Sequence, residues 1–89
     1  MGEQKYQGIM ILQDPVRGIF ENYVTAGRLG RESYDDAVST GIAGCVDVKE
    51  EQEEPIRILE HRWLEEPLDW ESILKIGKEM RAKYVPPPQ

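Results

Sequence analysis

The chain has few of the residues from which active sites and disulfides are built: its 89 residues include one cysteine and one histidine. A single cysteine, Cys45, excludes an intramolecular disulfide. Together with the lack of an apolar segment behind a charged N-terminus, it predicts a reducing, cytoplasmic setting. No apolar stretch approaches the roughly 18 residues that a membrane-spanning helix needs. We therefore expect no membrane segment.

Catalysis and metal binding find little support in this composition. General acid–base catalysis uses positioned groups, usually more than one, and His61 lies between charged neighbours, where a solvated imidazole is expected. Cys45 falls on an apolar helix face with no base beside it, which is typical of a small buried side chain. A Cys45–His61 pair stays open only because such partners meet in the fold. We expect a protein that is not an enzyme.

Other ligand-binding motifs are also absent from the sequence. One cysteine and one histidine cannot form a structural zinc site unless carboxylates complete it. The acidic residues at 50, 51, 53 and 54 lack the spacing of a calcium-binding loop. None of the eight glycines is part of a phosphate-binding loop. We predict no metal and no cofactor.

Positive charge is scarce, with 11 Lys and Arg against 17 Asp and Glu and a net charge of −6. Affinity for nucleic acid depends on neutralising phosphates with basic side chains, so the balance argues against a nucleic-acid partner. The acidic surface suits either plain solubility or attraction to a basic partner protein. A chain this short buries only about 60% of the surface that it exposes when unfolded. Many such proteins dimerise or dock on a partner, and this favours a binding role.

The first half of the chain predicts one strand and two helices. Tyr6–Leu12 is apolar on both faces, which is typical of a strand covered on both sides. Asp14 and Pro15 are favoured at the start of a helix. Apolar residues at a 3.6-residue period continue this helix to Gly30: Val16, Ile19, Phe20, Tyr23 and Val24. Ser33 begins a second helix that runs to Cys45, and residues 42–48 fit either helix or strand.

The second half predicts two further helices. Lys49–Glu54 is a charge run without an apolar anchor, typical of a linker. Pro55 begins a third helix over Ile56–Glu65, and Asp69 caps a fourth that extends to Tyr84. The expected fold is therefore mostly α, of the α+β class, with one short N-terminal strand followed by about four helices. Its parts are a 6–46 strand-helix-helix core, a 47–54 acidic linker, a 55–85 helical arm and an 86–89 Pro-rich tail.

The order of strand, Asp-started helix, glycine turn and Ser-capped helix resembles the ribbon-helix-helix family of bacterial DNA-binding proteins. The likeness covers about 35 of the 89 residues, and the matching residues are Ile9–Leu12, Asp14-Pro15, Ala26-Gly27-Arg28 and Ser33 with Asp36-Ala37-Val38. The resemblance implies strands paired across a dimer and, as in the family's antitoxins, an acidic tail that wraps a toxin. The chain departs from the family where base edges would be read, because Met10, Leu12, Ile9 and Ile11 are apolar.

These patterns predict a non-enzymatic protein–protein interaction module: an inhibitor, an adaptor or an accessory subunit. It would act through the amphipathic arm, with apolar anchors inside an acidic rim. The expected partner-binding residues are Trp63, Leu64, Glu65, Glu66, Asp69, Trp70, Ile73, Leu74 and Met80. The expected partner is a protein with a basic or apolar groove, and a homodimer is also considered. Whether the arm packs on its own core or on a partner is left open. The alternative is a ribbon-helix-helix-like antitoxin or transcriptional regulator.

Overall fold

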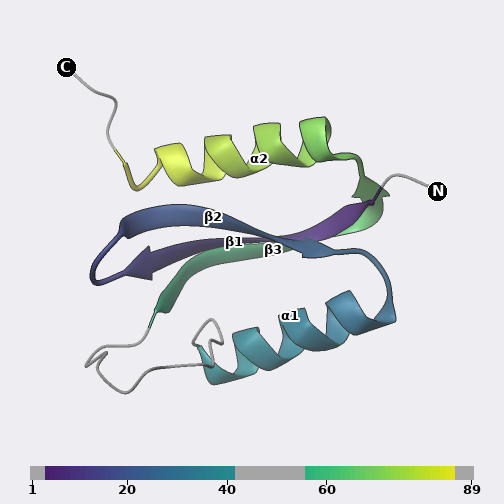
Figure 1. Ribbon diagram of the computed structural model, residues 1–89, viewed down its shortest axis with the longest axis horizontal. Helices are drawn as coiled ribbons and strands as arrows, with labels where there is room; N and C mark the ends of the chain where they lie inside the picture. The colour runs from purple at the N-terminus through teal and green to yellow at the C-terminus, as the bar shows by residue number, and fades with distance from the viewer. Residues whose placement is uncertain (1–3, 42–55, 86–89) are drawn as a thin grey trace.

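A three-stranded antiparallel sheet lies between two helices in the computed structural model of the protein, which describes residues 4–41 and 56–85 (Figure 1). The elements follow one another as β1 (Tyr6–Asp14), β2 (Gly18–Thr25), α1 (Arg28–Thr40), β3 (Arg57–Leu68) and α2 (Trp70–Ala82). The strand order is β2-β1-β3, so β1 is central. Helix α1 covers one face of the sheet and α2 covers the other (Figure 1).

The central strand supplies the core on both sides of the sheet. Ile9 and Ile11 pack on the α2 face, and Met10 and Leu12 pack on the α1 face. All four side chains are buried. Successive side chains of a strand point to opposite faces, so a strand covered twice is apolar throughout. The predicted strand, with both faces covered, is confirmed.

The expected helix from Pro15 to Leu29 is wrong, because this segment forms a hairpin with β1. The Asp14 carboxylate accepts hydrogen bonds from the backbone N–H groups of Val16 and Arg17, at 2.8 and 3.3 Å. Such an Asx turn competes with helix initiation at the same residue. Gly18 then adopts a φ of 91°, which glycine tolerates best. The chain reverses there and returns as β2, antiparallel to β1.

Helix α1 begins at Arg28, five residues before the expected Ser33 start. It ends at Gly41, whose left-handed conformation lets its N–H bond to the carbonyls of Ala37 and Val38. The expected continuation from Ile42 to Cys45 lies outside the described residues. So do the acidic linker at 47–54 and the tail at 86–89.

The expected third helix is also wrong: residues 57–68 form β3, which pairs antiparallel with β1. The fourth helix is confirmed as α2, where Asp69 caps the first turn by accepting a bond from the Ser72 N–H at 3.1 Å. The described residues therefore contain three strands and two helices, not one strand and four helices. Because β1 is paired on both edges within the chain, it cannot also pair across a dimer.

None of the helices in the described parts of the chain is long and apolar enough to cross a membrane.

Candidate functional site

The expected partner-binding residues are divided between the two faces of the sheet. Ile73 and Met80 are buried in the core between α2 and the sheet, and Leu64 packs against them. Leu74 is half-buried on the same helix. Trp63 lies on the other face, in the core beneath α1. The apolar stripe expected of an arm is therefore largely covered by the protein's own sheet.

Trp63 is held in an aromatic cluster between β3 and α1. Its ring lies 5.1 Å from that of Tyr34, and the Arg31 guanidinium sits 5.0 Å above it. Gly8 of β1 allows this packing, because a Cβ there would come within 3.1 Å of the indole and 2.9 Å of Val24 Cβ. Trp63 therefore ties the helix to the sheet.

Trp70 is the most exposed apolar member of the expected set, at 46% exposure. Its ring lies 5.3 Å from Tyr6 and 5.0 Å from Tyr23, at the start of α2. Of the expected acidic rim, Asp69 is engaged in capping α2, whereas Glu65 and Glu66 are exposed on β3. The structure thus leaves a small aromatic patch where the sequence predicted a long binding arm.

His61 lies on the α1 face of the sheet and bonds to α1. Its Nδ1 is 2.6 Å from the Tyr34 hydroxyl. Burial raises the pKa of that phenol above its usual value. Cys45, the candidate nucleophile, lies outside the described residues. Within those residues no three His, Cys, Asp or Glu side chains gather as a metal site would require.

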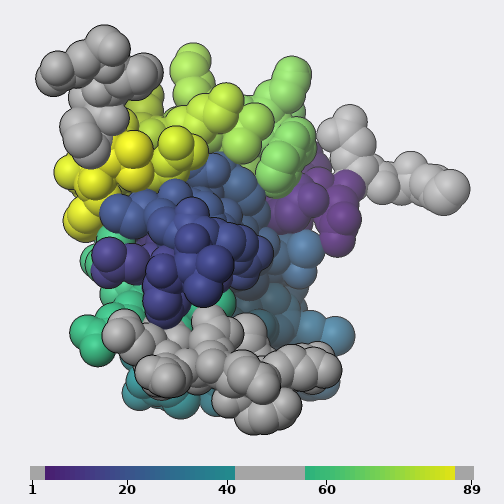
Figure 2. Space-filling model, turned by 60° about the vertical axis from the view of Figure 1, so that its left-hand side comes forward, coloured from purple at the N-terminus to yellow at the C-terminus, as the bar shows by residue number. Residues whose placement is uncertain are grey.

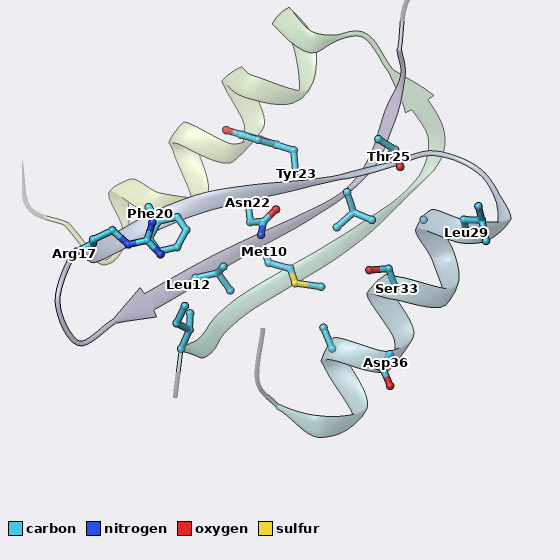
Figure 3. Close-up of a pocket in the computed structure, with 14 residues that line it drawn as sticks. Met10, Leu12, Arg17, Phe20, Asn22, Tyr23, Thr25, Leu29, Ser33 and Asp36 are labelled. Carbon is cyan, nitrogen blue, oxygen red and sulfur yellow. The ribbon is translucent and has the colours of Figure 1, made fainter. Parts of the chain in front are cut away.

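A hollow of about 580 Å³ lies between β2 and α1 (Figure 3). We call it the β2–α1 groove. Its apolar residues come from β1, β2 and α1 and from Ile56, which precedes β3, and its polar ones mainly from β2 and α1. The lining residues used below are Phe20, Asn22 and Val24 of β2 and Leu29, Ser33 and Asp36 of α1. Tyr23 contributes to the wall, but its side chain points to α2, away from the hollow (Figure 3).

The groove follows β2 along most of its length, because α1 runs back beside the strand that precedes it (Figure 1). Leu29 thus lies near Thr25 at one end, and Asp36 lies toward the Phe20 end (Figure 3). Gly30 sets the closest approach of helix and strand, since a Cβ at Gly30 would collide with the Thr25 carbonyl oxygen.

The edge of β2 is regular, and no strand of the described chain pairs with its outer side. From Gly18 to Val24 it pairs with β1 without a register shift. It contains no proline and one charged residue, Glu21. Glu21 is engaged by Arg81 at 2.9 Å on the α2 face. Unpaired strand edges of this kind are ready templates for pairing with another chain.

The other edge, β3, has the features that protect sheet edges. Its pairing with β1 shifts register twice, and Pro67 interrupts its row of N–H donors. Charged side chains also project from it: Arg57, Arg62, Glu65 and Glu66. Bulges, proline and charge all discourage strand addition. The two edges of the sheet are therefore unequal.

Two charged residues line the groove: Asp36 of α1 and Arg17 of the hairpin, which pairs with Asp14. Arg28 and Arg31 pair with Glu32 and Asp35 one turn on, at 3.7 and 3.0 Å. Asp36 has no described cation within ion-pair distance, and Leu29 is 75% exposed beside the groove. A hollow lined by both apolar and polar side chains, without a cluster of free basic groups among the described residues, suits a polypeptide better than an anionic metabolite.

Comparison with known proteins adds no relative: no family model, curated protein or solved structure matches the chain.

The sequence-based prediction missed every groove residue of β2, because it placed them on a helix. The Asp14-to-Gly18 spacing was the available signal for a hairpin turn.

Proposed function

We propose that the protein is a non-enzymatic interaction module that binds an extended segment of a partner polypeptide along β2. One observation carries this proposal: a regular strand edge, with which no strand of the described chain pairs, lies directly beside a groove of apolar and polar side chains. An inhibitor, an adaptor and an accessory subunit would all use such a surface. The groove and the edge replace the helical arm as the binding surface, since Ile73 and Met80 are buried inside the fold.

Strand addition supplies affinity and selectivity by separate means. The incoming backbone would bond to the outward N–H and C=O groups of β2, and every second side chain would project toward α1. Phe20 and Val24 are only half-buried on that face, and exposed Asn22 lies between them. We therefore expect apolar residues at alternate positions of the bound segment.

The ribbon-helix-helix alternative does not fit this surface. That family reads DNA with strands paired across two chains, whereas β1 here is internal and β2 carries one acidic residue and no basic one. Arg17, at the hairpin, is already bonded to Asp14 at 2.8 Å and lies over the Phe20 ring. A phosphate-binding surface would need more free basic groups.

A displayed library of random peptides tests the proposal without knowledge of the natural partner. Binders selected on the wild-type protein should protect β2 amides from hydrogen exchange and leave β3 amides unchanged. Replacing Leu29 by Glu should weaken these binders about tenfold, because losing about half of a buried leucine costs about 1.4 kcal/mol.

The matched control is Val16→Glu, the same kind of change at the hairpin tip. Val16 is 84% exposed and does not line the groove. Its replacement should leave binding within about twofold of wild type, a change of about 0.4 kcal/mol. Binders that protect another surface, or that respond equally to both variants, would refute the assignment of β2.

A further inference from the structure

We propose that, without a partner segment, the β2 edge is occupied by β2 of a second copy of this chain. The result is a symmetric homodimer with one sheet running through both copies. The dimer follows from the two unequal edges. Its regulatory consequence, that a partner segment and a second copy compete for β2, rests on the proposed function.

The sequence of β2 fits its own antiparallel copy in one register better than in the others. Opposed residues in a continuous sheet lie on the same face, so a two-fold axis must pass through a single residue position. An axis at Glu21 would oppose two carboxylates, which is destabilising. An axis at Asn22 avoids this and pairs Phe20 with Val24 of the second copy on the α1 face.

The same register places Glu21 opposite Tyr23 of the second copy on the α2 face. It retains almost the full length of β2, whereas an axis at Tyr23 would shorten the overlap. Phe20 and Val24 of the second copy would cover the β2–α1 groove, where Phe20 and Val24 are now half-buried. Three features therefore favour the axis at Asn22: it keeps the carboxylates apart, it retains most of the strand overlap, and it covers the groove with apolar side chains.

Helix α1 is complementary to an antiparallel copy of itself. The exposed base Arg28 lies at the start of α1 and Asp36 toward its end, whereas Arg31 lies over Trp63 of β3; α1 itself runs back along β2. Antiparallel β2 strands therefore bring antiparallel α1 helices together beneath them. The Arg28 end of each helix then faces the end of the other that carries Asp36, which has no cation nearby in the described chain.

The dimer is tested on the whole chain by sedimentation over a concentration series and by cysteine cross-linking. In a Cys45→Ser background, Asn22→Cys should form an intermolecular disulfide under mild oxidation. The reason is that side chains at an axis of strand pairing have Cβ atoms about 4.5–5.5 Å apart, close to disulfide range. Arg62→Cys, also exposed but on the protected β3 edge, is the matched control and should stay reduced. Equal cross-linking of the two variants, or a monomer at every concentration, would overturn the proposal.

Charge exchange tests the packing of the helices independently. Arg28→Glu should weaken dimerisation several-fold, and adding Asp36→Arg should restore it by reversing both charges. Failure of the second change to restore the dimer would overturn the α1 contact.

Hydrogen exchange separates failure of the dimer from failure of the proposed function. The expected result is that β2 amides are protected in the dimer, and that a library-selected peptide converts the dimer to a monomer whose β2 amides stay protected by the peptide. Peptide binding at β2 of a protein that is always monomeric would overturn the dimer and leave the proposed function standing. Protection of the β2 edge in a monomer without peptide would assign that edge to a segment of the same chain, and this would also overturn the dimer.

Discussion

Replacing Gly30 by alanine sets two opposite effects against each other. Alanine favours a helix over glycine by about 1 kcal/mol, so propensity alone predicts a more stable protein. The structure predicts the reverse, because the new Cβ would collide with the carbonyl oxygen of Thr25. Overpacking of this kind costs about 1–3 kcal/mol. The obstacle is backbone, so no change of rotamer relieves it.

We expect Gly30→Ala to lower the free energy of unfolding by about 1 kcal/mol net of the helix-propensity gain. Urea unfolding measures this directly. With an m-value of about 1 kcal/mol/M for a small domain, the midpoint should fall by about 1 M. Ser39→Ala, on the exposed side of the same helix, is the control and should change stability by only a few tenths of a kcal/mol. A Gly30→Ala protein as stable as wild type would refute the close approach of α1 to β2, and with it the shape of the groove.

Two further predictions concern pH. The hydrogen bond from the Val16 N–H, with help from Arg17, lowers the pKa of Asp14. The stability that ionised Asp14 contributes is therefore present above the usual pKa of about 3.9 and is lost as pH falls through the lowered value. Urea midpoints of Asp14→Asn should accordingly fall less than those of wild type between pH ~5 and ~2, and an equal fall would contradict the turn. Burial, followed by the charge of Glu21, raises the pKa of Tyr23 to about 12. Wild-type stability should decline as pH rises from about 10 through 12, and Tyr23→Phe should make that decline smaller. The Tyr23 hydroxyl is buried with no hydrogen-bond partner among the described residues, so Tyr23→Phe should leave stability near pH 7 unchanged or raise it by up to about 1 kcal/mol. A loss above about 1 kcal/mol would show that the hydroxyl is bonded.

The elements that could be predicted are those whose local signals agree with their packing. A continuous apolar run identifies β1, because both of its faces are covered. The Asp69 cap and the apolar stripe that follows identify α2, because one face of that helix is buried. In both elements the pattern of apolar residues matches the faces that are buried.

Prediction from apolar periodicity fails for β2, because this strand also contacts helices on both faces. Ile19 and Tyr23 face α2, whereas Phe20 and Val24 face α1. Two-sided burial removes the alternation of a half-buried strand and leaves apolar residues at 19, 20, 23 and 24, the spacing of a helix. Only the turn chemistry at Asp14 could have decided between the two.

A register shift produces the same error in β3. Ile58 and Trp63 belong to the α1-face core, and Leu59 and Leu64 to the α2-face core. Residues five apart share a face only because the pairing with β1 shifts between Ile11 and Leu12. The resulting pattern resembles helical periodicity, so no count of apolar spacing would have identified the strand. The groove could not be predicted either, because it exists only once β2 is a strand with α1 beside it.

The two helices decide where the sheet can associate. With α1 on one face and α2 on the other, neither face of the sheet is open to another sheet (Figure 1). In Figure 2 the hairpin of β1 and β2 projects toward the viewer below α2. Association in the plane of the sheet must then use an edge. Pro67 and two register shifts disfavour β3, whereas β2 contains no proline and pairs with β1 without a shift from Gly18 to Val24. A short chain that gains buried area from a partner would therefore gain it along β2, where covering the groove adds apolar contact to the backbone hydrogen bonds.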